Sequence, residues 1–366
     1  MKKSSGISKL SSKIAVMAII SMSILAASCN SKKASKELPV LKLTKAIKPT
    51  PVLDLFDIDG LAVKHGVMPK IETSNDLESV ILGKNDAKLT HLIKPLISAA
   101  GGADLVIFAG SMTNGHILYA NKDAAAQIHE LKDLKGHSIA MEQDNTGYFL
   151  IPNALKKRFG YTQDDVEIRL MFDEEAAISA VAKGEADVTN MPYSMARVAD
   201  SYGLVKIADL ADLAPDYACC RQTANGPKFR KDRDQFVAWT KGIIEAYKVY
   251  KTDKEHTIAV MTKKTGEDRQ WVIDNYYDPK YNAQWSAHPD PNYNGVRIQY
   301  DRCVEQGFVE NPRSIDDFFD ISVYADALRE IIKENPNDEF YKAMWPYFVS
   351  HNSEYPGFAE KYPETL

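Results

Sequence analysis

The chain has 366 residues, of which 45% are hydrophobic and 26% charged, the balance of a globular protein with room for two or three domains. Its 45 basic and 50 acidic residues give a formal net charge of −5. Nucleic-acid binding needs a clustered basic surface, and the sequence contains no such cluster, so we exclude that class of function.

Residues 1–28 have the pattern of a secretory signal peptide. Four lysines and no acid occur in the first 13 residues, the apolar run Ile14–Leu25 follows, and small residues lead to Cys29. As a helix rising about 1.5 Å per residue, this run spans about 18 Å, which is too short for a bilayer core of about 30 Å. We therefore predict a cleaved signal rather than a transmembrane anchor.

The residues before Cys29 resemble a bacterial lipobox, in which the cysteine becomes the lipidated first residue of the mature protein. Leu25 lies one position farther from Cys29 than in the usual pattern, so an incidental cysteine beside an ordinary cleavage site is the alternative. We favour lipidation at Cys29, because the polar stretch 30–37 (NSKKASKE) suits a membrane tether. Loss of residues 1–28 leaves 41 basic and 50 acidic groups, a net charge of −9.

Three further cysteines occur, Cys219, Cys220 and Cys303. They form no C-x-x-C pair, so neither a disulfide framework nor a structural zinc site is expected. We interpret Cys219 and Cys220 as small apolar core residues. No metal or cofactor is predicted.

Short apolar runs alternate with helical patterns from Leu41 onward. Residues 104–109 and 137–141 have the pattern of buried strands bounded by glycine, and residues 155–159 before Gly160 have that of a helix end. This alternation predicts an α/β fold with parallel sheets.

Two segments repeat a short helix, a glycine, an acid three residues later and a strand. They are residues 77–87, with Gly83 and Asp86, and residues 177–188, with Gly184 and Asp187. The repeat predicts two similar lobes.

The last third of the chain has a different pattern. Apolar residues at spacings of three and four predict an amphipathic helix over 235–250, and helical patterns continue through 316–333. Between them lies a loop over 275–294 that contains several aromatic residues. These form either a lid over a ligand or a seal between the helical third and the first lobe, and we favour the seal. They are Tyr276, Tyr277, Tyr281, Trp285 and Tyr293.

Four segments, taken in order, resemble the substrate-binding proteins of bacterial ABC importers. These segments are 101–110 (GGADLVIFAG), 133–140 (DLKGHSIA), 145–147 (NTG) and 180–187 (AVAKGEAD). The resemblance is to the group that handles nitrate, aliphatic sulfonates, taurine and thiamine pyrimidine precursors, and it extends over most of the mature chain.

This resemblance implies a two-lobed type II periplasmic-binding-protein fold with two crossover segments, near 116–121 and 217–222, and a helical C-terminal third. After the signal peptide (1–28), the expected parts are the lipidated cysteine and tether (29–40), lobe 1 (41–118 with 222–366) and lobe 2 (119–221). Residues 42–73 depart from the family pattern, so the first-lobe contacts are left open.

The resemblance also implies a function. The chain is expected to be a lipid-anchored protein on the extracytoplasmic face of a bacterial membrane. It would capture a sulfonate, nitrate, taurine or pyrimidine-like molecule in a cleft between the lobes and deliver it to an ABC permease. We expect a monomer.

Ligands in such folds bind beyond the carboxyl ends of parallel strands, near helix N-termini. Two loops in these positions offer hydroxyl and amide groups, although both also read as ordinary turns and caps. The candidate ligand-binding residues from them are Ser111, Thr113, Asn114, Asn145 and Thr146.

Three further candidates lie at the end of the second repeated strand and beside the second crossover. Asn190 and Tyr193 offer an amide and an aromatic hydroxyl, and Arg221 offers a bidentate partner for an anion. Tyr193 as a core residue and Arg221 as one half of an ion pair are the alternatives.

An enzyme is the rival class of function. Pyrimidine-precursor synthases of the same fold carry a cysteine-rich iron motif, CCCFC, and a lysine-bound pyridoxal phosphate, whereas this chain has only Cys219-Cys220 followed by Arg221. Neither a G-x-S-x-G elbow nor an H-E-x-x-H helix occurs, and we predict no catalytic residue. A ligand-sensing partner of a membrane receptor is a third possibility.

Overall fold

The computed structural model describes residues 37–45, 50–74, 76–142, 145–282 and 284–365. The chain divides into two compact units, residues 1–38 and 39–366, and every helix and strand below belongs to the second. The predicted signal peptide, Cys29 and most of the tether lie outside the described residues. Among the residues that are described, no helix is both long and apolar enough to span a bilayer.

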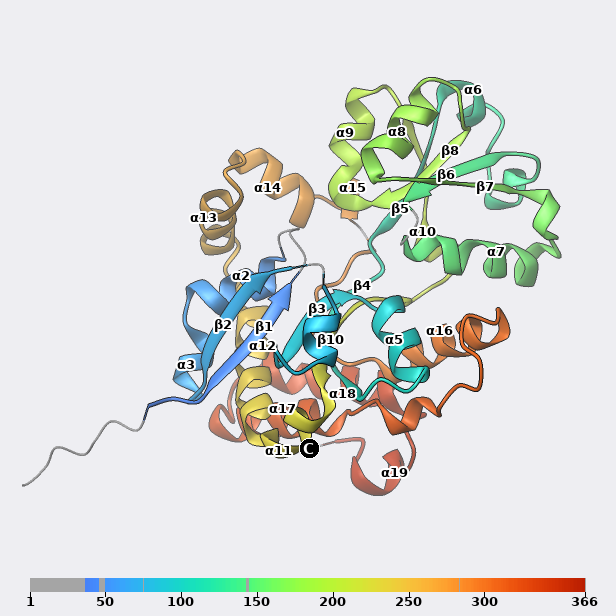
Figure 1. The fold of residues 1–366 in the computed structure, drawn as a ribbon. Coiled ribbons are helices and arrows are strands. Elements are labelled where there is room, and N and C mark those ends of the chain that lie inside the picture. The colour runs from blue at the N-terminus through green and yellow to red at the C-terminus, as the bar shows by residue number, and fades with distance from the viewer. Residues whose placement is uncertain (1–36, 46–49, 75, 143–144, 283, 366) are drawn as a thin grey trace, which may run out of the picture. The chain divides into compact units, whose positions relative to one another are not determined.

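The first sheet has the strand order β2-β1-β3-β10-β4 (Figure 1). β1 pairs in parallel with β2 and β3, whereas β10 runs antiparallel between β3 and β4. Its strands are β1 (Val40–Lys45), β2 (Met68–Thr73), β3 (Ala87–His91), β4 (Leu105–Thr113) and β10 (Ala218–Asn225).

The second sheet has the order β7-β6-β8-β5-β9 and repeats the first. Here β6 pairs in parallel with β7 and β8, and β5 runs antiparallel between β8 and β9. Its strands are β5 (His116–Ala120), β6 (Ser138–Glu142), β7 (Glu167–Met171), β8 (Val188–Pro192) and β9 (Val205–Asp209).

Helices connect the strands of both sheets. Those of the first sheet are α2 (Pro51–Ile58), α3 (Leu61–Lys64), α4 (Glu78–Ile81) and α5 (Ile93–Ala100). Those of the second are α6 (Lys122–Ala125), α7 (Thr146–Phe159), α8 (Glu174–Ala182), α9 (Ala196–Ser201) and α10 (Leu210–Leu213), with 3-10 turns η1 (Leu131–Leu134), η2 (Gln163–Asp165) and η3 (Tyr193–Met195).

The described residues after β10 form helices and no further strand, as the sequence pattern predicts (Figure 1). They are α11 (Gly226–Lys231), α12 (Arg233–Thr252), α13 (Lys254–Thr265), α14 (Arg269–Tyr276), α15 (Pro279–Asn282), α16 (Tyr293–Glu305), η4 (Ile315–Asp317), α17 (Ser322–Glu334), α18 (Glu339–Asn352) and α19 (Phe358–Lys361). The predicted fold class, a two-sheet α/β protein with a helical C-terminal third, is confirmed.

Local sequence features explain why the positions of helices α7 and α12 could be predicted. The Asn145 side chain caps α7, and Gly160 ends it in a left-handed conformation with φ of 72°, which glycine adopts without steric strain. The apolar stripe of α12 is buried, and its Trp239 donates an indole N–H to Gln222 Oε1 of β10 at 2.8 Å.

The chain passes between the sheets twice, over Thr113–His116 and over Asp209–Ala218. Both passages begin a few residues before the expected crossovers, so the expected lobe limits at 118/119 and 221/222 fall inside β5 and β10. Both strands are buried along their whole length. Their sequences therefore show no change in hydropathy at the point where the chain leaves one sheet for the other.

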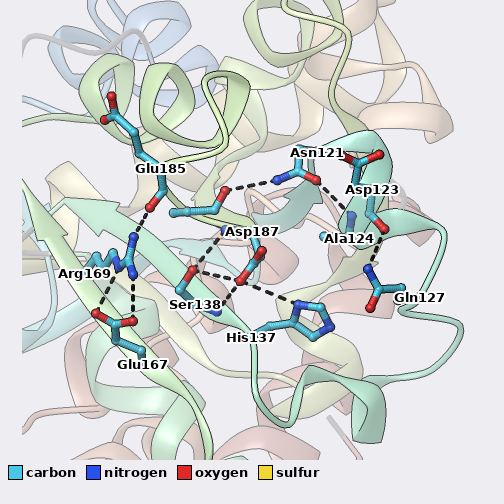
Figure 2. Close-up of polar contacts among 11 residues, drawn as sticks. Asn121, Asp123, Ala124, Gln127, His137, Ser138, Glu167, Arg169, Glu185 and Asp187 are labelled. Atoms are coloured by element: carbon cyan, nitrogen blue, oxygen red, sulfur yellow. Dashed lines mark hydrogen bonds and ion pairs between the residues drawn. The ribbon is translucent and has the colours of Figure 1, made fainter.

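The internal repeat predicted from sequence occupies equivalent positions in the two sheets, because β3 and β8 are both central strands. In the second sheet the Asp187 carboxylate accepts hydrogen bonds from the Ser138 N–H at 2.8 Å and the Ser138 hydroxyl at 2.9 Å (Figure 2). The Asp187 carbonyl accepts the N–H of Asn121, which then caps α6 through its side chain.

Asp86 makes the same contacts in the first sheet. Its carboxylate accepts the N–H of Lys42 on β1 at 2.8 Å, and its carbonyl accepts the N–H of Asn225, which caps α11. The acid that follows each glycine therefore fixes the start of a central strand against its parallel neighbour, which explains why the motif occurs twice.

Candidate functional site

A small pocket lies among the first turn of α2, the end of β4 and the loop 285–289. It has room for about one water molecule as the structure stands. Its walls are mainly apolar, with a few polar groups among them. The lining residues are Thr50, Pro51, Val52, Leu53, Leu89, Gly110, Ser111, Gln222, Ile243, Trp285, Ala287 and Pro289.

The start of α2 supplies hydrogen-bond donors to this pocket. Pro51 occupies the first helical position, which its fixed φ suits, and the Thr50 side chain makes no capping hydrogen bond. The first-turn N–H groups of Val52 and Leu53 have no acceptor within the helix, and the helix dipole adds partial positive charge at this end. Such an end favours an anion.

Trp285 supplies a further donor. Its Nε1–H is buried and has no hydrogen-bond partner among the described residues, although the side chain as a whole is only partly buried. A buried donor left without an acceptor is unfavourable by about 1–3 kcal/mol. An oxygen atom in the pocket would remove this penalty.

Gln222, another polar residue of the wall, already has hydrogen-bond partners. Its Oε1 accepts from Trp239, and its Nε2 donates to the carbonyl of Gly110 at 3.5 Å. Gly110 itself permits close packing of the loop, because a Cβ there would stand 2.0 Å from the carbonyl oxygen of Asp290. Gln222 and Gly110 therefore shape the pocket rather than offer free groups to it.

A buried ion pair fixes α2 beside β1. Lys45 Nζ lies 2.6 Å from Asp54 Oδ1, and the Asp54 carboxylate also accepts the N–H of Thr50 at 2.9 Å. Lys264 Nζ approaches the same carboxylate to 3.9 Å. Two cations thus surround one carboxylate behind the helix start, which gives this region a net positive charge.

Ser111 is the one predicted ligand-binding residue that lines this pocket. Thr113 and Asn114 lie just beyond it, at the passage between the sheets. Thr113 forms an isolated bridge with Ser286, and the Asn114 amide donates to the carbonyl of Gln284 at 3.0 Å. These two residues therefore hold the loop that carries Trp285.

The second sheet brings Asn145, Thr146 and Asn190 together. Asn190 Nδ2 donates to Asn145 Oδ1 at 2.5 Å, and Asn145 Nδ2 donates to the Asn190 carbonyl at 3.1 Å. In the part of the chain that the structure describes, which omits residues 143–144, Asn190 Oδ1 and Thr146 Oγ1 are buried without a hydrogen-bond partner. The site thus keeps two polar atoms available to a further group.

Tyr193 links this cluster to the pocket. It follows β8, donates its backbone N–H to Gly115 at 2.9 Å, and packs its ring 5.0 Å from that of Trp285. Burial raises the pKa of its phenol well above the usual value, so the hydroxyl stays neutral. Tyr193 thus lies three residues after Asn190 in the chain and packs against Trp285 of the pocket.

Arg221 is completely buried, and its guanidinium donates mainly to protein carbonyls. These are Pro291 O at 2.8 Å, Met112 O at 2.7 Å and its own neighbour Cys220 O at 2.8 Å. Burial raises the pKa of the nearby Asp290 carboxyl to about 7, against the opposing effects of hydrogen bonds and of Arg221. The structure gives Arg221 the role of fixing the 286–291 loop.

The aromatic residues of the 275–294 loop fall into two groups that differ in their surroundings. Tyr276, Tyr281 and Tyr293 are buried, as a seal requires, and the Tyr293 hydroxyl donates to Asp316 at 2.5 Å. Trp285 instead lines the pocket, which fits the ligand-covering alternative rather than the seal that the sequence analysis favoured. The start of α2 was missed, although Pro51 after Thr50 was a usable signal for a helix N-terminus.

Comparisons with known proteins agree with this fold. Residues 78–223 match the family model described as "ABC transporter, phosphonate, periplasmic substrate-binding protein". A search of the curated proteins found no match.

Solved structures are similar over most of the chain. The periplasmic aliphatic sulphonate binding protein SsuA from Escherichia coli has a TM-score of 0.64 at 19% identity, covering 76% of this chain and 91% of its own. The periplasmic nitrate-binding protein NrtA from Synechocystis PCC 6803 has a TM-score of 0.64 at 13% identity, covering 81% and 89%. The desulfurization enzyme DSZB has a TM-score of 0.59 at 12% identity, covering 80% and 99%.

These findings confirm the predicted resemblance to ABC substrate-binding proteins and the predicted periplasmic-binding-protein fold. Since one similar structure is an enzyme, the fold by itself does not decide between binding and catalysis.

Proposed function

We propose that the chain is the substrate-binding subunit of an ABC importer and that it binds a small oxyanion, a sulfonate, phosphonate or nitrate, in the pocket at the start of α2. One observation carries this proposal. The buried indole N–H of Trp285, which has no partner within the described part of the chain, and the first turn of α2, where Thr50 makes no side-chain cap, line the same pocket.

An oxyanion suits these donors better than a cation or a neutral hydrocarbon does. Its oxygens accept several hydrogen bonds at once, and bonds to a charged acceptor are about twice as strong as neutral ones. None of the residues that line the pocket is acidic, and Lys45 and Lys264 lie behind the helix start. The acid-free lining and the nearby lysines both favour a negatively charged ligand.

The second group of predicted residues suits the remainder of the ligand. Thr146 Oγ1 and Asn190 Oδ1 offer a hydroxyl and an acceptor, and Tyr193 connects them to Trp285. We propose that an organic sulfonate or phosphonate places its anionic head against α2 and its other end toward these groups. Nitrate, which has no such second end, would use the first group alone.

The pocket must enlarge to accept more than a water molecule. Proteins of this fold close on their ligands by a hinge, and the passages 113–116 and 209–218 are where such a hinge would bend. The proposed subunit delivers its ligand to a permease, and Cys29 anchors it by lipid to the extracytoplasmic face of the membrane. Deletion of the gene should then reduce uptake of the ligand, whereas unchanged uptake would favour a sensing role.

A thermal-shift screen tests the binding proposal. The purified protein is heated with methanesulfonate, taurine, methylphosphonate, nitrate and, as the non-anionic comparison, a hydroxymethylpyrimidine. A ligand present at about a thousand times its dissociation constant adds about 4 kcal/mol of stability, a shift of several degrees.

Two tryptophan variants test whether the stabilising ligand binds at Trp285. Trp285→Phe keeps the ring but removes the N–H, so it should reduce the shift with the anion that stabilises the wild type. Trp271→Phe makes the same change on α14, outside the pocket, and should leave the shift unchanged. Stabilisation by the pyrimidine alone, or equal shifts in both variants, would overturn the proposal.

The enzymatic alternative has its own test. Stoichiometric iron or a pyridoxal chromophore in the purified protein would favour a synthase-like enzyme over a binding protein.

A further inference from the structure

Three potential metal ligands that are distant in the sequence meet where the chain passes between the sheets. His91 ends β3, and Cys219 and Cys220 lie in β10; the ligand atoms of all three lie within 4.8 Å of one another. None of them lines the proposed oxyanion pocket. The cluster is therefore a separate feature of the molecule.

A β-bulge explains how adjacent cysteines reach one site. Successive side chains of a regular strand point to opposite faces. Here Ala218 pairs with Thr113 and Cys220 with Met112, so three residues of β10 oppose two of β4, and Cys219 is the extra one. Such bulges re-aim side chains, and the two sulfur atoms lie 3.6 Å apart.

The sulfur separation fits a shared metal ion. Two thiolates bound to one tetrahedral zinc at about 2.3 Å each stand about 3.8 Å apart. The observed separation is close to this value without rearrangement. His91 is in register with Cys220 across the strand pair, so the backbone hydrogen bonds of the sheet hold the third ligand in place.

His116, the first residue of β5, lies beside this cluster, with its ring centroid 6.4 Å from that of His91. The Cys219 side chain also has hydrogen-bonding contacts with Cys220, His116 and His91. His116 Nδ1 lies 3.1 Å from the Tyr217 hydroxyl, which fixes the ring and leaves the other nitrogen for a metal.

We propose that Cys219, Cys220, His91 and His116 form a zinc-binding site at the hinge between the two sheets. Two thiolates and two neutral imidazoles balance the charge of Zn²⁺, which suits a site whose cysteines and His116 are buried. Sulfur and imidazole ligands in a tetrahedral arrangement select zinc over magnesium or calcium. Because His116 belongs to the second sheet and the other three to the first, the ion would join both sides of the hinge.

Zinc titration of the full protein tests this site. The protein is kept reduced, so that Cys219 and Cys220 remain thiols, and zinc is titrated against a chromophoric chelator. The expected result is a single tight site per chain. Cobalt in place of zinc should give the sulfur-to-metal charge transfer and the intense d–d bands of a tetrahedral thiolate complex.

Matched variants assign the ligands. Cys219→Ser with Cys220→Ser should abolish tight binding, whereas Cys303→Ser, which changes a buried cysteine of α16 outside the cluster, should leave it intact. His91→Gln should weaken binding by at least about tenfold, since even outer-shell partners contribute that much.

The cobalt spectrum needs only the wild-type protein. It therefore still tests the proposal if a variant fails to fold. Reduced wild-type protein that binds no zinc would overturn the proposal. So would zinc binding that persists in a folded double-cysteine variant, or a cobalt complex without thiolate charge transfer.

Discussion

Replacement of Asp187 by alanine should destabilise the protein through a defined pair of hydrogen bonds. The Asp187 carboxylate accepts both the N–H and the hydroxyl of Ser138, at 2.8 and 2.9 Å, and lies 3.6 Å from His137 Nδ1 (Figure 2). A hydrogen bond to a charged group contributes about 1.5–3 kcal/mol. Because the side chain is 39% exposed, we take the lower end and expect a total loss of about 2–3 kcal/mol.

Urea unfolding followed by far-UV circular dichroism measures this loss as a lower midpoint. Asp123→Ala is the matched control, since Asp123 is an exposed acid of the same sheet's α6 whose side chain makes none of these contacts. Asp86→Ala should show a smaller loss in the first sheet, where the carboxylate accepts one such hydrogen bond, from the Lys42 N–H. Equal midpoints for Asp187→Ala and Asp123→Ala would refute the role assigned to the repeat.

The same carboxylate gives a pH dependence with a definite sign. Burial acts to raise the pKa of Asp187, but the hydrogen bonds from Ser138 and the interaction with His137 together outweigh it, and the folded-state pKa is lowered. A lowered folded-state pKa stabilises the protein above the unfolded value of about 3.9, and this contribution is lost as the pH falls through the folded value. The stability gap between wild type and Asp187→Asn should therefore close on acidification from pH 6 to pH 3 and not on raising the pH; a gap independent of pH would contradict this.

Three further predictions concern the site and the anchor. Gly147→Ala should lower stability and disturb the second-sheet cluster, because a Cβ there would stand 2.1 Å from Asn190 Nδ2; an unchanged thermal midpoint would argue against this packing. Tyr193→Ala should weaken binding of the stabilising anion without unfolding the protein, since it removes the ring beside Trp285. Unaltered affinity in a titration would take Tyr193 out of the site. Cys29→Ala should release the protein from membranes on fractionation, and detergent-dependent fractionation of that variant would contradict lipid anchoring.

The fold was predictable because its signals are local. Gly83-x-x-Asp86 and Gly184-x-x-Asp187 mark the starts of both central strands, and each acid makes its contacts within its own sheet. Gly160 likewise ends α7 by its own backbone conformation. Such features depend on a few neighbouring residues, and a sequence displays them directly.

The site was less predictable because its parts meet through tertiary packing. Trp285 lies more than a hundred residues beyond Ser111, and no local pattern shows which way its indole points. Arg221 was predicted to hold an anion, and in the structure its guanidinium donates to carbonyls of β4, β10 and the 286–291 loop. The spacing rule for zinc ligands does not single out Cys219 and Cys220, because the bulge that brings their sulfur atoms together appears only once β10 is paired with β4.

The indole N–H of Trp285 offers the most direct test of the account. The chain has four tryptophans, so a spectrum of protein labelled with nitrogen-15 at tryptophan contains few indole signals, and Trp285→Phe identifies the relevant one. We predict that this signal shifts on titration with the oxyanion that stabilises the protein, and saturates at the same ligand concentration as the thermal effect. A stabilising anion that leaves the Trp285 signal in place while other signals move would show that the ligand binds elsewhere.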